Sequence, residues 1–400
     1  MSQNEERSMV KNGEIELVGV TKRFDEVVAI NDITLKIPAG TYCCLIGPSG
    51  CGKTTILRMI AGHDSPTQGD VRIDGRSVVG LPPVKRGTAM MFQSYALFPH
   101  LSCMDNVAFS LKMRGMPKDE RREKAREMLK RVHMDQFADR MPAELSGGQQ
   151  QRIALARSLV TDPHVLLLDE PLSALDEFLR VQMRGNLRQM QKELGITFIH
   201  VTHTQMEAIA VADLVVVMDH GNIDQAAPAR EVYFRPRSTY VARFMGGQNV
   251  FSGQVVSVNG KEAEIEEDAG GRFTVPVQGT AIKEGQSFSF AVRRDHVEVE
   301  KAAEDAVLKT EETNTILGTV IMTEYQGTWV KVTVEREGAE SFVAYIPDDR
   351  FSARPVTEGD RVIARWSMEA IHPLVHEGDE DMSRLFGEDF NPGAAPGSAS

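Results

Sequence analysis

No stretch of this sequence approaches the ~20 consecutive apolar residues that a membrane-spanning helix needs, although 42% of its 400 residues are hydrophobic. The segment MSQNEERSMVKNGE at the start is polar and acidic, and it lacks the apolar core of a secretory signal peptide. We therefore expect a protein without transmembrane helices that stays in the cytoplasm.

Cysteine is also scarce, and basic residues are fewer than acidic ones. The four cysteines, Cys43, Cys44, Cys51 and Cys103, have neither metal-ligand spacing nor a disulfide-rich pattern, so we expect them to pack in a reducing compartment. The 45 Lys and Arg residues are outnumbered by 57 Asp and Glu residues, which gives a net charge of -12. Because that charge repels nucleic acid and anionic lipid, a general DNA or RNA binder is not expected.

The length and the distribution of charge indicate more than one domain. A chain of 400 residues exceeds the roughly 100 to 200 residues of an ordinary domain, so two or three domains are expected. Residues 1–247 hold 31 basic and 29 acidic residues, whereas residues 248–400 hold 14 and 28. The first part is therefore nearly neutral, and the acidic surplus lies in the second.

The first part alternates short apolar segments with helical stretches such as Lys118–Arg131. Strands are expected over Ile15–Val20, Tyr42–Ile46, Val165–Leu168, Thr197–Val201 and Leu214–Met218. This alternation predicts an α/β domain with a largely parallel sheet.

The second part has segments of alternating polarity between glycine-containing turns, which predicts a small all-β domain. Strands are expected over Phe251–Val258, Phe288–Val292, Trp329–Val334, Phe342–Ile346 and Arg361–Trp366.

A short pattern occurs twice in this second part. Asn249 and Gly253 have the same spacing as Asn314 and Gly318, and each glycine is followed two residues later by valine. The repeat suggests two related halves, with chance alignment as the alternative. From residue 377 onward the chain is acidic and then rich in Gly, Ala, Pro and Ser, which predicts a disordered tail.

The strongest local signal is a loop that fits G-x-x-x-x-G-K-[ST] after the expected strand Tyr42–Ile46 and before an expected helix Thr55–Ala61. The loop comprises Gly47, Pro48, Ser49, Gly50, Cys51, Gly52, Lys53 and Thr54, with Thr55 opening the helix. Its glycines let successive N–H groups face phosphates at a helix N-terminus. In such a loop Lys53 reaches the β and γ phosphates and Thr54 offers its hydroxyl to magnesium. The alternative interpretation is a glycine-rich turn with an exposed lysine.

A second acidic element complements this loop. The apolar run 165–168 ends in Asp169 and Glu170, as expected for a strand buried on both faces. Asp169 is expected to hold the magnesium through water, and Glu170 to face the attacking water as general base. The alternative is a solvated strand edge. The loop alone leaves kinases, GTPases and many ATPases open.

The segment LSGGQ, which begins at Leu145, narrows this choice. Its other residues are Ser146, Gly147, Gly148 and Gln149. With this signature the chain resembles the ATP-binding-cassette (ABC) ATPases over roughly residues 14–247. Ser146 and Gly148 are expected to open a helix Gln149–Leu159, so that their N–H groups form a second phosphate cradle.

The resemblance implies further site residues in the order of the family. Gln93 looks like the Q-loop glutamine that joins the magnesium shell, and His203 looks like the switch histidine that orients water and γ-phosphate with Glu170. Phe24 stands where the family stacks an aromatic ring on adenine. Asp176 ends a D-loop-like segment and is counted among the nucleotide-binding residues.

The same resemblance shows one residue that departs from the family pattern, and it implies a second copy of the chain as a partner. Many relatives have an acidic residue after the switch histidine, where this chain has Thr204, so a hydrogen bond from that acid is in doubt. In the family, ATP lies between the P-loop of one copy and the signature of another. The resemblance therefore implies an ATP-sandwich homodimer with ATP and Mg²⁺ as cofactors.

The β part resembles the TOBE-type domain of ATPases that serve bacterial binding-protein-dependent importers. Its segment 292–296 stands where those relatives have Arg-Pro-Glu, with Arg294 replacing the proline. The stretch 92–100 looks most like the polyamine and iron(III) branches, with polyamine slightly preferred and sulfate or sugar systems as alternatives. Apolar side chains in residues 94–101 are expected to dock a permease helix or, alternatively, to pack in a helical subdomain.

The expected fold is an α/β P-loop ATPase, an ABC nucleotide-binding domain with a helical subdomain, followed by a small all-β OB-like (TOBE) domain. The expected divisions are a flexible N-terminus over 1–13, the ATP-binding domain over 14–247, the TOBE-type domain over 248–376 and the tail over 377–400. The resemblance implies transmembrane permease partners, an indirect periplasmic solute-binding protein, no nucleic acid, and a peripheral position at the cytoplasmic face of the bacterial inner membrane.

Two alternatives to a transport ATPase differ in how well they fit this sequence. Soluble ABC ATPases of DNA repair or ribosomes usually carry two cassettes or a coiled-coil insertion and basic surfaces, whereas this chain has one cassette, no heptad run and net acidity. A regulatory role, with the β domain sensing an oxyanion or a partner protein, is compatible with transport.

Overall fold

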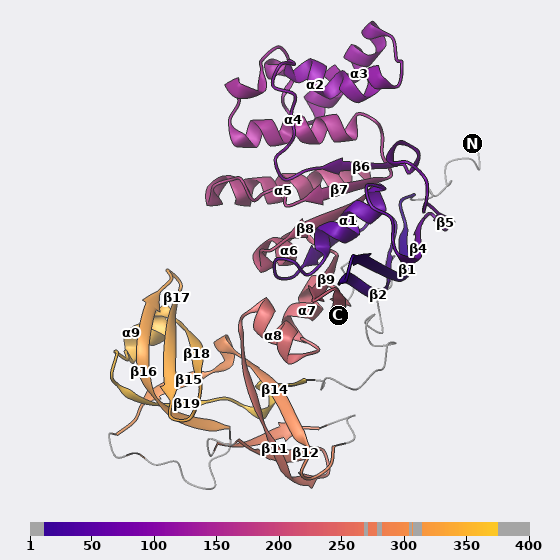
Figure 1. Cartoon of the computed structure of the whole chain (residues 1–400). Helices are drawn as coiled ribbons and strands as arrows, with labels where there is room; N and C mark the ends of the chain where they lie inside the picture. The colour runs from indigo at the N-terminus through magenta and orange to yellow at the C-terminus, as the bar shows by residue number, and fades with distance from the viewer. Residues whose placement is uncertain (1–11, 268–270, 278–281, 304–305, 307–313, 375–400) are drawn as a thin grey trace, which may run out of the picture. The chain divides into compact units, whose positions relative to one another are not determined.

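The chain forms two compact units, of which the first ends at Arg230 and the second begins at Glu231 (Figure 1). The computed structural model describes residues 12–267, 271–277, 282–303, 306 and 314–374. Among the helices in these ranges, none is long and apolar enough to cross a membrane. The predicted tail and residues 1–11 of the predicted flexible N-terminus lie outside the described residues, and the predicted boundary after residue 247 stays a prediction.

A six-stranded sheet forms the centre of the first unit, in the order β10-β9-β3-β8-β7-β6. Its strands are β3 (Tyr42–Ile46), β6 (Thr88–Met91), β7 (Val165–Asp169), β8 (Thr197–Thr202), β9 (Leu214–Asp219) and β10 (Asn222–Ala227). All neighbours pair in parallel except β9 and β10. The strands β3 and β8 are buried throughout, as expected for the apolar runs of a covered parallel sheet. The predicted α/β fold class is confirmed.

A second sheet in this unit is antiparallel and was not predicted. Its order is β2-β1-β4-β5, with bounds β1 (Ile15–Phe24), β2 (Val27–Ile37), β4 (Gln68–Ile73) and β5 (Arg76–Ser77). Only its first strand was expected, and that strand runs past Val20 to Phe24. Register shifts between β1 and β2 interrupt the alternation of buried and exposed residues, which obscures the strand signal in the sequence.

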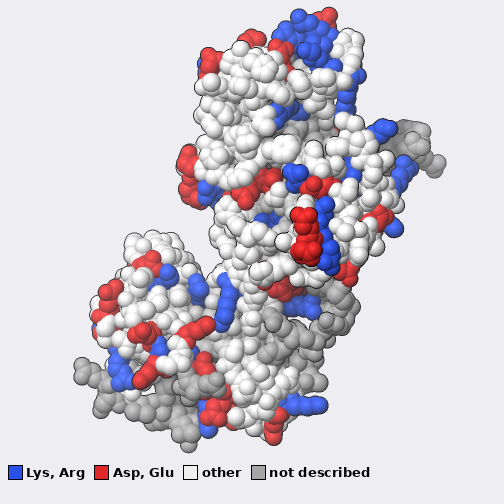
Figure 2. Space-filling view, in the orientation of Figure 1, with Lys and Arg blue, Asp and Glu red and all other residues white. Residues whose placement is uncertain are grey.

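Helices α2, α3 and α4 lie together as a subdomain of the first unit (Figure 1). The helices of this unit are α1 (Lys53–Ala61), α2 (Cys103–Met113), α3 (Lys118–Arg131), α4 (Gly147–Leu159), α5 (Glu177–Leu194) and α6 (Gln205–Val211), with 3-10 turns at Pro83–Lys85, Asp135–Phe137 and Pro142–Glu144. Val107, Leu129 and Ile153 form part of the shared core of the subdomain. Figure 2 shows Lys and Arg side chains gathered over α3, whose outer face is solvent-exposed.

The second unit contains two five-stranded sheets of matching order, β13-β12-β11-β14-β20 and β18-β17-β16-β19-β15. The strands are β11 (Gln248–Asn259), β12 (Glu262–Glu266), β13 (Arg272–Pro276), β14 (Ser287–Arg293), β15 (Glu298–Lys301), β16 (Thr315–Tyr325), β17 (Trp329–Arg336), β18 (Ala339–Pro347), β19 (Arg361–Arg365) and β20 (Ile371–Leu374). The helical segments are α7 (Ala229–Phe234), which begins before the division, α8 (Thr239–Met245) and α9 (Asp348–Ala353), with 3-10 turns at Arg294–His296 and Met368–Ala370. Each half of the repeat gives its fifth strand, β15 or β20, to the sheet of the other half.

The repeated asparagines make the same contact in each half. The Asn249 amide donates to Val343 O at 2.8 Å and accepts from Val343 N at 2.9 Å. The Asn314 amide makes the same pair of bonds to Thr274, at 3.1 and 3.0 Å. Each asparagine thereby bonds the third strand of the opposite half, so the short sequence pattern reflects a structural duplication.

The repeated glycines also correspond. A Cβ on Gly253 would lie 2.4 Å from Glu266 O, and one on Gly318 would lie 2.5 Å from Glu335 O, so neither position has room for a side chain. Glu267 and Arg336 follow these two glutamates directly, so they occupy corresponding positions in the two halves. They form an ion pair with each other.

Charges on the second unit are mixed. In Figure 2, Asp and Glu side chains of this unit are interspersed with Lys and Arg. Several form ion pairs, including Lys331 with Glu324 and Lys301 with Asp360. This arrangement is that of a solvated, locally compensated face.

Candidate functional site

The predicted nucleotide-site residues follow neighbouring strands of the parallel sheet. Strands β3, β8, β7 and β6 are adjacent and parallel, so their carboxyl ends lie at one edge. The glycine-rich loop follows β3, His203 follows β8, Glu170 follows β7, and Gln93 lies just beyond β6. Ligands of open α/β sheets bind outside this edge.

The loop between β3 and α1 requires its glycines. Gly47, Gly50 and Gly52 have φ values of 156°, 84° and 102°, which L side chains rarely adopt. A Cβ on Gly47 would lie 2.3 Å from Met218 O, and one on Gly52 would lie 2.4 Å from Ile30 Cδ1. Helix α1 begins at Lys53, earlier than the predicted Thr55, so the loop leads directly into a helix N-terminus. That geometry suits a phosphate group.

Lys53 is held inside the loop. Its Nζ donates hydrogen bonds to Gly47 O at 2.8 Å and Pro48 O at 2.7 Å, and it lies 3.5 Å from Cys51 Sγ. The residue is 6% exposed. Among the residues that the structure describes, no carboxylate forms an ion pair with this buried ammonium, and phosphate oxygens would supply that compensation.

Thr54 and Asp169, the two residues predicted to hold magnesium, lie within hydrogen-bond distance of each other. The Thr54 hydroxyl donates to Asp169 Oδ1 at 3.0 Å. Burial raises the pKa of the Asp169 carboxyl, and the Thr54 hydrogen bond opposes that shift. A desolvated carboxylate beside a hydroxyl gains from a nearby cation, because the cation offsets the cost of burial.

Glu170 lies at the centre of a second cluster. Gln93 Nε2 donates to Glu170 Oε2 at 3.1 Å, and His203 Nδ1 lies 3.5 Å from Glu170 Oε1. The backbone of Glu170 has a φ of 45°, which turns its side chain away from the direction of β7. Its N–H donates to Val201 O, and its carbonyl accepts from Ser173 Oγ at 2.9 Å, so this conformation is anchored on both sides.

Two residues that support this cluster were not among the predicted site residues, although Ser173 lies in the D-loop-like segment. Ser173 accepts a weak hydrogen bond from Gln93 Nε2 at 3.4 Å in addition to holding the Glu170 carbonyl. Arg157 of α4 donates to Ala96 O at 2.6 Å and Tyr95 O at 2.7 Å, and so ties the segment after Gln93 to the signature helix. Nothing in the local sequence marks Arg157, since an arginine on a helix normally faces solvent.

The signature residues begin helix α4 and lie apart from this cluster. Ser146 caps the helix, accepting from Gln149 N at 3.4 Å, while Gln149 Oε1 accepts from Ser146 N at 2.9 Å. The helix therefore begins at Gly147 rather than at the predicted Gln149. A Cβ on Gly148 would lie 2.9 Å from Leu179 Cδ2, which explains the small residue there. Within the described part of the chain, residues 146–149 make no hydrogen bond to the glycine-rich loop.

Asp176 and Phe24 have local contacts of their own. Asp176 caps helix α5, accepting from Leu179 N at 2.9 Å, so a structural role accounts for this carboxylate. Phe24 ends β1 and is 46% exposed, with Lys22 Nζ 4.7 Å from its ring centroid. An exposed aromatic ring is available for stacking, although the structure does not place it against the Glu170 cluster.

The turn after His203 is held without an acidic residue at position 204. Thr204 N donates to Thr202 Oγ1 at 3.0 Å, and that hydroxyl donates to Glu207 Oε2 at 2.5 Å. Glu207 is buried in α6, so its carboxylate fixes the hydroxyl that holds the turn. These hydrogen bonds hold the backbone next to His203. The sequence had put a hydrogen bond at this turn in doubt, because position 204 is not acidic.

Two families match this chain. The ABC transporter family matches residues 30–173, and the TOBE domain matches residues 290–374. Clostridium perfringens cbiO1, described as part of the ABC transporter complex cbiONQ, has a solved structure with a TM-score of 0.52 and 29% identity. The comparison covers 55% of this chain and 89% of that one.

Curated relatives match over most of the chain. The spermidine/putrescine import ATP-binding protein PotA of Rubrobacter xylanophilus is 41% identical, over 91% of this chain and 94% of its own length. The Fe(3+) ions import ATP-binding protein FbpC 1 of Rhizobium meliloti is 44% identical, over 84% and 92%. A PotA of Oleidesulfovibrio alaskensis is 52% identical over 60% of this chain, and that match spans 65% of the relative.

Proposed function

Because this chain belongs to the ATP-binding proteins of the ABC transporter family, and is therefore an ATPase, we propose that it energises polyamine import through separate membrane permeases. The observation that carries the proposal is the meeting of Gln93, Glu170 and His203 beside the Thr54–Asp169 pair, at the carboxyl edge of the sheet. This edge joins a phosphate-binding loop to a carboxylate suited to activating water.

The roles of the clustered residues follow from their contacts. Glu170 accepts a proton from the attacking water, since its carboxylate is turned out of β7 and is oriented by the Gln93 amide. His203 lies on the other carboxylate oxygen and orients water and γ-phosphate together with Glu170. Lys53 exchanges its bonds to Gly47 and Pro48 for phosphate oxygens when nucleotide binds.

The residues present fit a magnesium ion. Mg²⁺ prefers oxygen ligands and is usually held by one or two protein groups together with substrate phosphates. Thr54 and Asp169 provide a hydroxyl and a partly desolvated carboxylate 3.0 Å apart, and the amide of Gln93 would complete the set. Bound there, the ion would neutralise the developing charge of the transferred phosphoryl group.

A second copy of the chain completes the nucleotide site in this proposal. The signature residues present a capped helix N-terminus, yet they make no hydrogen bond to the glycine-rich loop within the described part of the chain. ATP bound by the loop of one copy and the signature of another would have both phosphate cradles. The proposed assembly is therefore a homodimer with ATP at each shared site.

Permease docking is assigned to a surface hollow beside the helical subdomain, with a volume of about 340 Å³. Val84 and Met113 line it, and their exposures of 79% and 68% leave apolar side chains open to a partner helix. Arg157 also lines it, and that residue bonds the segment after Gln93. Tyr95, in the stretch where docking was expected, is only 5% exposed, so the packing alternative holds for that residue.

The partners place the chain at a membrane. We assign it to the cytoplasmic face of the bacterial inner membrane, bound peripherally to permeases that receive cargo from a periplasmic solute-binding protein. Polyamine is the preferred cargo because relatives named for spermidine and putrescine import match over most of both chains. Iron(III) is the second candidate, since relatives named for Fe(3+) import match over 84% of this chain.

Reconstitution tests the transport role and the cargo. The chain is purified with its co-purifying membrane subunits, placed in liposomes and assayed with the cognate solute-binding protein. Spermidine or putrescine should stimulate ATP hydrolysis and accumulate inside the vesicles, whereas Fe³⁺ should do neither. Stimulation by Fe³⁺ alone would replace the cargo assignment. ATP hydrolysis that no solute stimulates, with no uptake into the vesicles, would contradict the transport role.

A further inference from the structure

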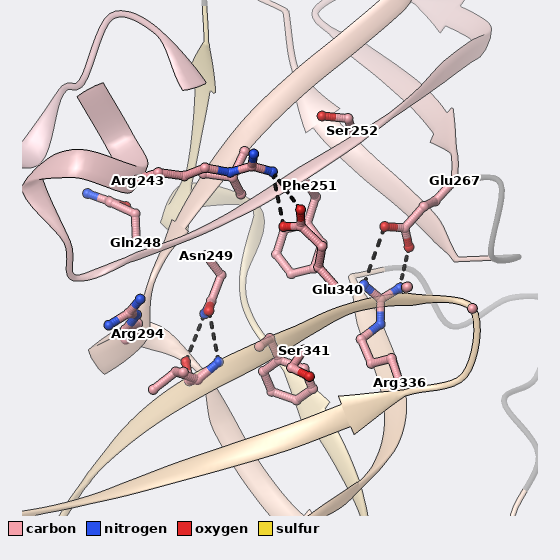
Figure 3. A pocket seen from close by; sticks show the side chains of 15 residues that line it. Arg243, Gln248, Asn249, Phe251, Ser252, Glu267, Arg294, Arg336, Glu340 and Ser341 are labelled. Atoms are coloured by element: carbon pink, nitrogen blue, oxygen red, sulfur yellow. Dashed lines mark hydrogen bonds and ion pairs between the residues drawn. The ribbon is translucent and has the colours of Figure 1, made fainter. Parts of the chain in front are cut away.

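The second unit contains a cavity of about 490 Å³ between β11 and β18 (Figure 3). Residues 248–252 of β11 and residues 339–343 of β18 form two of its walls. The volume falls within the roughly 300 to 1,000 Å³ typical of small-molecule sites. None of its lining residues belongs to the first unit, so the cavity is separate from the residues proposed for ATP hydrolysis.

Most of the charge around the cavity is already paired. Three arginines and two glutamates line it: Arg243, Arg294, Arg336, Glu267 and Glu340. Arg336 is 8% exposed and forms an ion pair with Glu267, while Arg243 and Glu340 pair at 3.0 Å near the surface. These two pairs leave a single positive charge on the cavity wall.

That charge belongs to Arg294. No ion pair joins its guanidinium to a carboxylate among the residues that the structure describes, and its nearest ring contact is Tyr345, 5.9 Å from the centroid. Its Nε is buried and lacks an acceptor. A buried guanidinium N–H without an acceptor costs free energy that an anionic occupant would recover.

A buried acceptor lies on the same side of the cavity. Gln248 is 4% exposed, and its Nε2 donates to Tyr233 O at 3.0 Å. Its Oε1 is buried and receives no hydrogen bond. Figure 3 shows Gln248 and Arg294 on one side of Asn249, with the Arg336–Glu267 pair on the other. An acceptor and a cationic donor, both without a hydrogen-bond partner, therefore belong to residues on the same side of the cavity.

We propose that this cavity binds a small organic carboxylate that also carries a hydroxyl or amino group. The carboxylate accepts from Arg294, and the hydroxyl or amino group donates to Gln248 Oε1. A polyamine does not fit, because the lining carries one more arginine than glutamates. Sulfate satisfies Arg294 but offers no donor to Gln248, and it is small for the cavity.

Calorimetry on the full chain without nucleotide tests this site with three probes. L-malate and succinate are dicarboxylates that differ by one hydroxyl, and sulfate is an anion without a donor. L-malate should bind saturably with a Kd below about 1 mM. Succinate should bind about fivefold more weakly, since it lacks the donor that Gln248 requires.

Two substitutions assign the contacts. Arg294→Met should weaken L-malate binding about tenfold or more, because it removes the charge and the Nε–H donor. Gln248→Met should bring L-malate and succinate to similar affinities, because the acceptor for the hydroxyl is gone. The matched controls are Arg350→Met and Gln254→Met, which change exposed residues of the same unit and should leave L-malate binding unchanged.

The comparison of probes on the native chain does not depend on any variant folding. Equal affinity for L-malate and succinate, or tighter binding of sulfate than of either, would overturn the proposal. So would the absence of saturable L-malate binding up to about 10 mM. An Arg294→Met chain that retains native tryptophan fluorescence and full L-malate affinity would also overturn it. None of these results depends on the transport assay.

Discussion

The side-chain amide of Gln93 donates a hydrogen bond to the carboxylate of Glu170 at 3.1 Å. Gln93 follows an edge strand of the parallel sheet, and its neighbours Tyr95 and Ala96 are held through their carbonyls by Arg157. The proposed general base is thus connected to the surface proposed for permease docking by one glutamine and one arginine. A partner that moves the segment after Gln93 would change how Glu170 is oriented.

Glu170→Gln should separate ATP binding from ATP hydrolysis. The substitution preserves the shape of the side chain but removes the proton acceptor, so ATP hydrolysis should fall about 100-fold or more while ATP binding persists. In gel filtration with ATP and Mg²⁺, the variant should shift from monomer to dimer. Glu193→Gln, at an exposed position of α5, should hydrolyse ATP like the native chain. A variant that binds ATP yet elutes as a monomer would contradict the proposed shared site.

Lys53→Ala should lower nucleotide affinity. The ammonium is buried within the loop and provides a charge for phosphate oxygens, so its removal should raise the Kd for ATP about tenfold or more. Equilibrium titration with a fluorescent ATP analogue measures the change. Lys85→Ala, which alters an exposed lysine of the same unit, is the control and should leave the Kd unchanged. Unchanged affinity in Lys53→Ala would remove the loop from the nucleotide site.

His200 should make the stability of the first unit depend on pH. Burial lowers the pKa of its imidazole from 6.5 to about 3, although the Glu207 carboxylate lies 3.8 Å away. The unfolded chain therefore binds a proton below pH 6.5 that the folded chain excludes, so this contribution is lost as pH falls. The free energy of unfolding should decrease by about 1.4 kcal/mol for each pH unit in that window.

Urea unfolding by circular dichroism at about pH 7 and about pH 5 checks this expectation, with ATP used to identify the transition of the first unit. His200→Gln should show a shallower pH dependence than the native chain. His220→Gln, whose native side chain is 92% exposed, should keep the native slope. If the free energy of unfolding changed with pH equally in the native and His200→Gln chains, His200 would be protonated in the folded state over this range.

Asn249→Ala and Asn314→Ala should destabilise the second unit by similar amounts. Each amide makes a donor and an acceptor bond to one backbone residue, so its removal leaves two buried groups unpaired at about 1 to 3 kcal/mol each. Both tryptophans of the chain, Trp329 and Trp366, lie in this unit, so tryptophan fluorescence reports its unfolding. Asn259→Ala, at the exposed end of β11, should have little effect.

Most residues of the proposed nucleotide site could be identified in the sequence because they lie in short contiguous motifs. The spacing of glycines in residues 47–54 and the acidic end of β7 both depend on local backbone geometry, and Thr54 meets Asp169 because β3 and β7 end at the same edge. The resemblance to a family supplied Gln93 and His203. Their approach to Glu170 depends on a φ of 45° that no sequence pattern reveals.

Other features depend on contacts between distant segments. The exchange of β15 and β20 between the two β sheets could not be predicted, since strand pairing over such separations is set by packing rather than by local pattern. The cavity between β11 and β18 has the same origin, because Gln248 and Arg294 are ordinary polar residues until the fold buries their unpaired atoms. The recurrence of asparagine, glycine and valine at one spacing did indicate the duplication.

The Arg336–Glu267 pair makes the two halves of this duplication chemically unequal. The two residues occupy corresponding positions in the two halves, and Arg336 is almost fully buried. Two identical copies of either half, associated in the same way, would place arginine against arginine or glutamate against glutamate, and buried like charges repel. Each half therefore supplies the charge that the other half lacks, so neither half could replace the other in this buried pair.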